Sequence, residues 1–285
     1  MKYFLASTAH LERSLLFKDN EDFIAAMNFV AIVAFLSGVT VLSFVLMSNH
    51  VHFVLICSSE KAEKFINRFK KFYSAYYQRK YGGKEFLRRL KFDIRPLRLE
   101  DESLQKGIAY VIVNPVAANL CLNPAMYPWG TGDTFFNLNP KTGRQLSCFT
   151  RNKQRKLLHS KVSLPQSYCI SEEGYILPSS FIPVRQVESL FRTPKGLNHF
   201  INNSSKAKIR LEKSAAPTFS DQLILSACND LIRSLFRAQC INDLDNYQKG
   251  LLLDQLRRRF SADIGQVCRV TGISYSDAAV MIDNI

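Results

Sequence analysis

Two histidines separated by one residue, His50 and His52, stand inside the apolar run 47–56. The residue types of this run favour a β-strand, in which positions i and i+2 point to the same face. Both imidazoles can therefore converge on one divalent cation. A histidine pair on one strand face is as often structural as metal-binding, so a third ligand and a reactive group are needed to indicate chemistry.

The segment 104–114 offers both of these groups. Its apolar spacing predicts a helix with a core stripe of Leu104, Ile108, Val111 and Ile112. Tyr110 and Asn114, four residues apart, lie one above the other on a different face. Gly107 shares that face and is expected to leave room for a backbone to approach. The tyrosine oxygen could attack a phosphodiester, and the amide oxygen could complete the metal site.

The chemistry of these groups is complementary. A phenol has an ordinary pKa of about 10, so it needs electrostatic help to act as a nucleophile at neutral pH. A cation held by three neutral ligands, His50, His52 and Asn114, would keep its charge for the scissile phosphate and the leaving 3′ oxygen. Nitrogen and oxygen ligands suit Mg²⁺ or Mn²⁺. The phosphotyrosine formed conserves bond energy, so the cut can be reversed onto a new 3′-OH.

Three segments carry a resemblance to a known family. Residues 47–55 look like the HUH segment of the REP-associated tyrosine transposases, which are relatives of the insertion-sequence-200 transposases. Residues 110–118 are similar to their nucleophile segment, in which a tyrosine precedes an Asn-Pro step, and residues 127–129 resemble the motif that closes their catalytic domain. The chain has Ser48 where the family usually has proline, and Ala117 in the place of a usual arginine.

The resemblance implies an α+β catalytic domain over 1–132, built on a ferredoxin-like antiparallel sheet with helices. It also implies a metal-dependent, single-stranded DNA endonuclease and strand transferase that acts on imperfect DNA hairpins. In this interpretation Tyr110 forms a 5′-phosphotyrosine intermediate, while His50, His52 and Asn114 hold Mg²⁺ or Mn²⁺.

Strand and helix signals alternate in the first part of the chain, as expected for an α+β fold. The predicted strands are 3–7, 39–46, 50–56 and 91–98, and the predicted helices are 21–36, 62–80 and 104–114. The uncharged run 23–49 is long enough to span a bilayer, but Ser37-Gly38 interrupts it. We therefore expect a buried helix followed by a buried strand, and no membrane partner.

The rest of the chain is predicted to add two regions. Residues 133–245 read as a basic linker and a helical region, and 246–285 as a helix-turn-helix-like DNA-binding module. In that module we expect helices at 251–260 and 263–269, a turn at Thr271-Gly272, and a third helix capped by Ser274. A helical bundle without DNA contact stays open, because Asp277 and Asp283 lie where a recognition helix would prefer basic or amide groups.

The charge distribution indicates a polyanionic partner. The formal net charge is +14, with 12 Lys or Arg and two acids in 64–98, and seven basic residues and no acid in 141–161. Aromatic residues interleave with the first cluster, although several recur at core spacing. Seven cysteines without a C-x-x-C pair fit a reduced, cytoplasmic protein. The cations expected to contact single-stranded DNA are Lys70, Lys71, Arg79, Arg88, Arg89, Arg257 and Arg258.

Other functions stay open at this point. A relaxase or rolling-circle nuclease could use the pair Tyr76-Tyr77, although neither has an amide four residues on. A DNA-binding regulator derived from a transposase would have no need of a nucleophile over a metal, and an RNA-hairpin binder is a third possibility. The remaining histidines have no partner at ligand spacing and are expected to be ordinary residues: His10, His159 and His199. No protein partner is predicted.

Overall fold

The computed structural model describes residues 2–82, 90–204 and 218–285. The chain forms two compact units. The first contains Met1–Ala9, Asn20–Leu46 and Val51–Ser214, and the second contains His10–Asp19, Met47–His50 and Ala215–Ile285. These units cut across the three predicted domains, 1–132, 133–245 and 246–285.

Four strands form one antiparallel sheet in the order β2-β3-β1-β4. β2 and β3 form a hairpin around the turn Ser48-Asn49, and β1 pairs with both β3 and β4. The strands are β1 Lys2–Thr8, β2 Thr40–Met47, β3 His50–Cys57 and β4 Phe92–Leu97. Each one overlaps the strand that the sequence predicts. β4 contains Pro96, which is tolerated because β4 is an edge strand.

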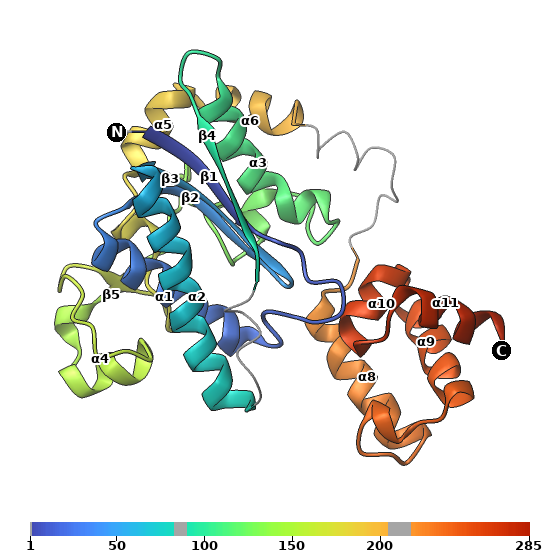
Figure 1. Ribbon diagram of the computed structural model, residues 1–285. Coiled ribbons are helices and arrows are strands. Elements are labelled where there is room, and N and C mark those ends of the chain that lie inside the picture. Colours follow the sequence, from blue (N-terminus) through green and yellow to red (C-terminus); the bar gives the residue numbers. More distant parts are fainter. Residues whose placement is uncertain (1, 83–89, 205–217) are drawn as a thin grey trace. The chain divides into compact units, whose positions relative to one another are not determined.

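The two faces of this sheet are covered by different helices (Figure 1). Phe53 of β3 packs against Phe65 and Phe69 of α2 (Ser59–Tyr81), with ring centroids 5.2 and 5.4 Å apart. His52, the residue before Phe53, instead contacts Tyr110 of α3 (Ser103–Ala117) on the opposite face. The alternation of β3 therefore separates an aromatic core face from the face that carries the histidines.

The long apolar helix of the first unit is α1, Asn20–Ser37. By length and composition alone it could cross a membrane, but 67% of it is buried within the protein. It packs against α2, where Phe29 lies 5.6 Å from Phe72 between ring centroids. A helix that is apolar on all sides is expected to be buried in a core, so the predicted buried helix is confirmed.

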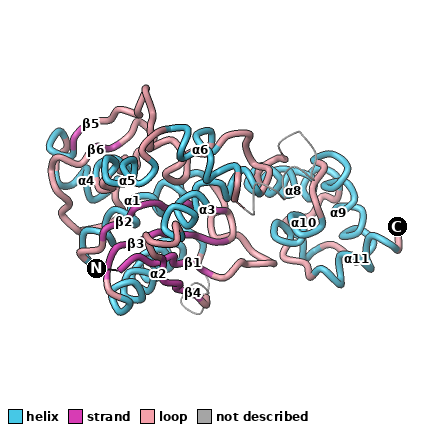
Figure 2. Tube along the Cα trace, turned by 90° about the horizontal axis from the view of Figure 1, so that it is seen from above, coloured by secondary structure: helices cyan, strands magenta, loops and turns pink. Residues whose placement is uncertain are grey.

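Residues 133–204 fold as part of the first unit. Asn28 of α1 donates from Nδ2 to the carbonyl oxygens of Leu157 and Gly174, both at 3.1 Å, and accepts from the Ile176 amide at 2.8 Å. A buried side chain therefore ties part of the stretch that was predicted as a basic linker and helical region to the core of the first unit. Its elements are β5 Arg144–Gln145, β6 Cys169–Ile170, α4 Arg151–Leu157, α5 Val184–Phe191 and α6 Pro194–Asn202. Figure 2 shows β5 and β6 as a strand pair separate from the main sheet.

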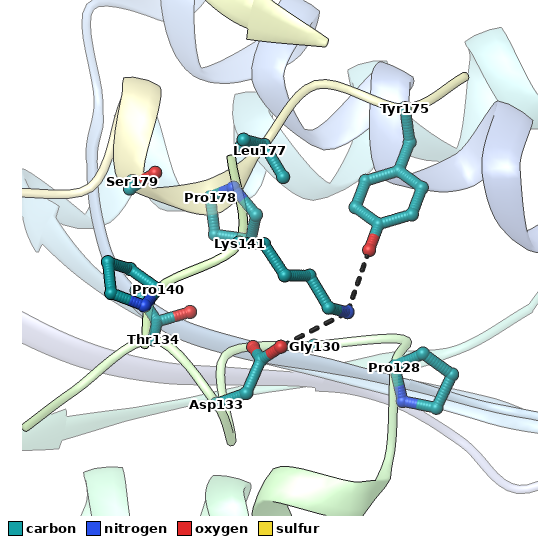
Figure 3. A pocket seen from close by; sticks show the side chains of 10 residues that line it. All are labelled: Pro128, Gly130, Asp133, Thr134, Pro140, Lys141, Tyr175, Leu177, Pro178 and Ser179. Atoms are coloured by element: carbon teal, nitrogen blue, oxygen red, sulfur yellow. Dashed lines mark hydrogen bonds and ion pairs between the residues drawn. The ribbon is translucent and has the colours of Figure 1, made fainter. Parts of the chain in front are cut away.

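A small pocket shows how this stretch is held. Lys141 lies between Asp133 and Tyr175, with its Nζ 3.1 Å from the Asp133 carboxylate and 3.0 Å from the Tyr175 hydroxyl (Figure 3). Burial alone would lower the pKa of Lys141, but the hydrogen bond to Tyr175 and the charge of Asp133 outweigh it and raise that pKa. Lys141 is thus a structural cation with an internal partner.

The second unit is mainly helical, with α8 Asp221–Leu235, α9 Asn246–Phe260, α10 Ile264–Thr271 and α11 Tyr275–Asp283. Gly272 ends α10 with φ +76°, and the Ser274 hydroxyl accepts from the Asp277 amide at the start of α11. The three predicted C-terminal helices are confirmed, and α8 joins them in one core. Short 3-10 turns lie at Pro124–Met126, Leu146–Cys148, Pro178–Ser180 and Ile241–Asp243.

Candidate active site

His50 and His52 are the first and third residues of β3. His50 and His52 are 5% and 3% exposed, and both belong to a strand whose residues are all buried. Burying two imidazoles in an apolar strand has a cost unless polar groups or a cation meet them. The strand thus places two nitrogen ligands in a part of the core where apolar side chains would make the fold more stable.

A third histidine joins this pair. His10, in the segment after β1, stacks on His50 with ring centroids 3.7 Å apart and planes 19° apart. The ligand nitrogens of His10, His50 and His52 all lie within 4.8 Å of one another. His10, which we expected to be an ordinary residue, therefore has possible metal co-ligands close to it in space. Sequence spacing does not reveal this histidine, because a loop brings it back beside the strand.

The orientation of the His50 ring follows from its neighbour. Asn49 donates from Nδ2 to the Leu11 carbonyl at 2.9 Å, which turns its Oδ1 toward His50 Nδ1 at 2.8 Å. An amide oxygen only accepts, so Nδ1 carries the proton and Nε2 of the neutral ring carries the lone pair. This is the arrangement of many metal-binding histidines, whose second nitrogen donates to an oxygen.

Helix α3 brings the predicted nucleophile to the same face. The Tyr110 ring meets His52 edge-on, with centroids 5.3 Å apart and planes 83° apart. Asn114, one turn further on, is 2% exposed, and its Nδ2 donates to the Tyr110 carbonyl at 2.8 Å. With the amide nitrogen committed to the helix backbone, a cation would have to be met by the amide oxygen.

Gly107 of α3 faces the sheet. A Cβ at this buried position would come within 2.7 Å of Cδ1 of Leu97, the last residue of β4. The room that the glycine leaves is therefore occupied by a side chain of β4, and not by a backbone.

A cation that the sequence analysis missed lies near the tyrosine. Burial raises the pKa of the half-buried Tyr110, while the positive charge of Arg95 lowers it. Arg95 in β4 pairs with Leu5 of β1, and His52 in β3 pairs with Ser7 of β1. Leu5 and Ser7 are two residues apart, so the side chains of Arg95 and His52 lie on the same face of the sheet. Arg95 also forms an ion pair with Asp93. The alternation of β4 could have indicated this position.

The cations that we predicted to contact DNA differ in their exposure and in their partners. Lys70 is 5% exposed and donates to the Leu90 carbonyl at 2.6 Å, so it is a buried residue and we withdraw it as a phosphate contact. Lys71 and Arg79 are exposed on α2. In α9, Arg257 and Arg258 are both exposed, and Arg258 pairs with Asp254 at 2.8 Å. Arg88 and Arg89 lie outside the described residues.

Of the paired tyrosines of α2, Tyr76 belongs to the core and Tyr77 is partly exposed. Tyr76 is 5% exposed and donates to buried Asp22 at 3.2 Å, and Lys80 lies 3.0 Å from the same carboxylate oxygen. Burial and the charge of Asp22 raise the pKa of Tyr76 to about 12, with Lys80 opposing them. A buried phenol that is hydrogen-bonded to a carboxylate is poorly suited to attack DNA, which disfavours Tyr76 as a nucleophile.

Comparison with known proteins adds little beyond this geometry. No family model matches the chain, and no curated protein does either. The solved structure of a REP-associated tyrosine transposase bound to a REP hairpin is similar over 46% of this chain and 78% of that one, with 16% sequence identity and a TM-score of 0.35. At this degree of likeness, function has to be argued from the residues.

Proposed function

We propose that this chain is a metal-dependent, single-tyrosine transposase that cuts and rejoins single-stranded DNA, with DNA hairpins as its substrates. One observation carries the proposal. His52 and Tyr110 come from a strand and a helix far apart in the sequence, yet their rings meet on one sheet face beside His50 and His10. A nucleophile next to clustered nitrogen ligands is the minimal equipment for tyrosine-based phosphoryl transfer.

We also assign the sheet to the ferredoxin-like class. The order β2-β3-β1-β4 and the antiparallel pairing of β1 with its two neighbours support this assignment. In this arrangement the strand with the histidines is an inner strand, flanked by β1 and β2. An inner strand is held on both sides, so it can fix ligands more firmly than an edge strand.

His50 and His52 are proposed to hold the cation, with Asn114 as the third ligand and His10 as an additional one. Two nitrogens that bind one ion at about 2.1 Å lie at most about 4.2 Å apart, so a histidine set within 4.8 Å needs only small ring movements. Mg²⁺ or Mn²⁺ in this position would supply positive charge that polarises the scissile phosphate and stabilises the departing oxygen.

Tyr110 is proposed to perform the covalent step. Its Oη attacks phosphorus and the P–O bond to the 3′ oxygen breaks. The phenolic proton passes to solvent and the departing 3′ oxygen takes one up, so that a 5′-phosphotyrosine and a free 3′-OH form. Attack by a 3′-OH reverses these changes, so rejoining needs no nucleotide cofactor. Arg95 is proposed to favour the phenolate and to contact the phosphate, because its charge already acts on Tyr110.

The test is covalent capture. The full chain is incubated with labelled single-stranded DNA hairpins and Mn²⁺, and a denaturing gel separates protein-linked DNA from free DNA. We expect a metal-dependent adduct on a subset of hairpins. Tight hairpin binding without any adduct or strand cleavage would instead favour the second candidate, a non-catalytic regulator derived from a transposase.

A further inference from the structure

A compact cluster of cations in the first unit lies outside the proposed active site. Residues 141–171 contain seven Lys or Arg and no acid. Lys141 has its partner Asp133, but the other six side chains are exposed and form no ion pair within the described part of the chain. We call these six the α4 cations: Arg144, Arg151, Lys153, Arg155, Lys156 and Lys161.

The α4 cations sit on a fixed frame. Buried Gln154 of α4 donates from Nε2 to the carbonyl oxygens of Leu146 and Phe149 at 2.7 and 3.0 Å. Asn28 of α1 holds the end of the same helix through the Leu157 carbonyl. A flexible basic tail would pay a large ordering cost on binding, whereas this helix presents its charges already ordered.

Arg155 and Lys156 lie in the last turn of α4, where positive charge stabilises a helix, but the other cations bring it no such benefit. Arg151 and Arg155 are four residues apart, and like charges at this spacing destabilise a helix by about 0.2–0.5 kcal/mol. Gln154 and Leu158 occupy the buried side, so the cations cover the exposed arc of the helix. Exposed cations that form no ion pair within the described part of the chain indicate a polyanionic ligand.

A hollow of about 220 Å³ lies beside α4. Arg144 and Phe149 line it, with the guanidinium 5.1 Å from the centre of the phenyl ring. Such a platform suits a stacked nucleobase. Glu172 also lines the hollow, and a carboxylate disfavours a phosphate there while accepting from the amino group of a base. A Cβ at Gly143 would come within 2.3 Å of the Ile170 carbonyl, so only glycine fits this wall.

We propose that the α4 cations and this hollow form a binding surface for a single-stranded stretch of the DNA substrate outside its hairpin. The cations of α4 contact successive phosphates, and one base enters the hollow and stacks on Phe149. The choice of DNA as the ligand rests on the proposed function. The surface itself rests on charge, exposure and the aromatic platform, and it requires no cleavage.

The experiment measures binding of the full chain to a labelled single-stranded DNA oligonucleotide by fluorescence anisotropy, without divalent cations and over a range of salt concentrations. The test variant is Arg155→Gln with Lys156→Gln. The matched control, Arg185→Gln with Lys195→Gln, removes one exposed arginine and one exposed lysine from α5 and α6 of the same unit. A third variant, Phe149→Leu, removes the ring and keeps an apolar side chain.

We expect the test variant to bind at least fivefold more weakly at about 0.1 M salt, with the slope of log K against log salt reduced by about 1.4, as for two lost single-strand phosphate contacts. Phe149→Leu should weaken binding by at least fivefold without changing that slope, since stacking carries no charge. The control should stay within twofold of the parent chain.

Equal affinity of the test variant and the control for DNA would overturn the proposed surface. Tighter binding of an RNA oligonucleotide of the same sequence would overturn DNA as the ligand of this surface. These outcomes are separable from a failure of the proposed function. If no adduct forms at Tyr110 while the α4 variants still lose DNA affinity, the surface stands and the transferase proposal falls.

Discussion

At the residue scale, the proposed function depends on a few polar groups, among them two histidines buried in an apolar strand. Asn49 orients His50, His50 stacks on His10, and His52 meets Tyr110. Each contact limits the rotation of a ring, which is what a ligand set needs before a cation binds. The predictions at this scale concern the share of each histidine and of Asn114 in metal binding.

His52→Ala should reduce Mn²⁺ affinity by more than about 100-fold, because it removes a buried ligand at the centre of the site. His10→Ala should cost less, about 10-fold, because His10 is exposed and can be replaced by water. Isothermal titration calorimetry of the DNA-free protein measures both values, with His199→Ala as a control in another part of the fold. Unchanged Mn²⁺ affinity in His52→Ala would exclude the proposed ligand set.

Asn114→Ala should weaken cleavage by about 10- to 100-fold at low Mn²⁺ and recover part of the activity at high Mn²⁺, because it loosens the cation without deleting the attacking atom. The readout is the cleavage rate of a hairpin substrate as a function of Mn²⁺ concentration. A rate that no amount of Mn²⁺ improves would mean that Asn114 acts through the fold of α3 and not as a ligand.

The sequence predicted the chemistry of the site better than its complete residue set. The spacing of His50 and His52, and of Tyr110 and Asn114, is local, so a single strand or helix reveals each pair. His10 and Arg95 reach the site through a loop and through strand pairing, which local spacing does not show. Lys70 could have been recognised as buried, because it lies four residues after Ile66 and three before Tyr73, both core residues of α2.

At the element scale, α1 and α2 are joined by a buried polar cluster around Asp22. Its carboxylate accepts from the hydroxyls of Tyr76 and Tyr81 and pairs with Lys80. This cluster fixes how the two helices pack on the sheet face opposite the histidines. It also couples their packing to pH.

Tyr76→Phe should lower the free energy of unfolding by about 1–2 kcal/mol near pH 7, because it removes a hydrogen bond to Asp22. The pKa of Tyr76 is raised to about 12 in the folded protein, above the value of about 10 in an unfolded chain. Between pH 10 and pH 12 the folded state therefore binds the phenolic proton more tightly than the unfolded state does. Its contribution to stability is therefore present below pH 10 and declines as pH rises toward 12.

Urea unfolding at pH 7, 9 and 11 measures this effect. The stability difference between the parent chain and Tyr76→Phe should shrink at pH 11, whereas Tyr247→Phe, at a residue 59% exposed, should show a small and constant difference. A pH-independent difference for Tyr76→Phe would contradict the coupling.

The seven predicted elements up to residue 117 are all present, because each has a long periodic or β-rich pattern. The stretch 133–204 was read as a linker and helices, since two-residue strands and a seven-residue helix leave no periodicity to detect. Its order comes from tertiary bonds such as those of Asn28, which spacing cannot reveal. The domain boundaries at 132 and 245 stay predictions.

At the scale of the whole molecule, the positive charge is the property that DNA binding would use. The helical second unit carries Arg257 and Arg258 on the exposed side of α9, while α11 contains Asp277 and no cation. DNA contact by this unit stays a prediction, and α9 is a better candidate for it than the predicted recognition helix.

Arg257→Gln should weaken DNA binding about two- to fivefold and reduce the salt slope by about 0.7, the value for one single-strand phosphate contact. Arg258→Gln should have a smaller effect, because Arg258 already pairs with Asp254. Anisotropy titrations at several salt concentrations measure both. Identical affinities and slopes for the parent chain and both variants would leave the second unit without a role in DNA binding.

The most direct measurement is the mass of the peptide that becomes linked to DNA when the full chain reacts with a hairpin and Mn²⁺. We predict a single modified peptide with the DNA joined through a 5′ phosphate to Tyr110, and no adduct from Tyr110→Phe, which should still fold, bind Mn²⁺ and bind the hairpin. An adduct at Tyr76 or Tyr77, or an active Tyr110→Phe enzyme, would contradict the assignment of Tyr110 as the nucleophile.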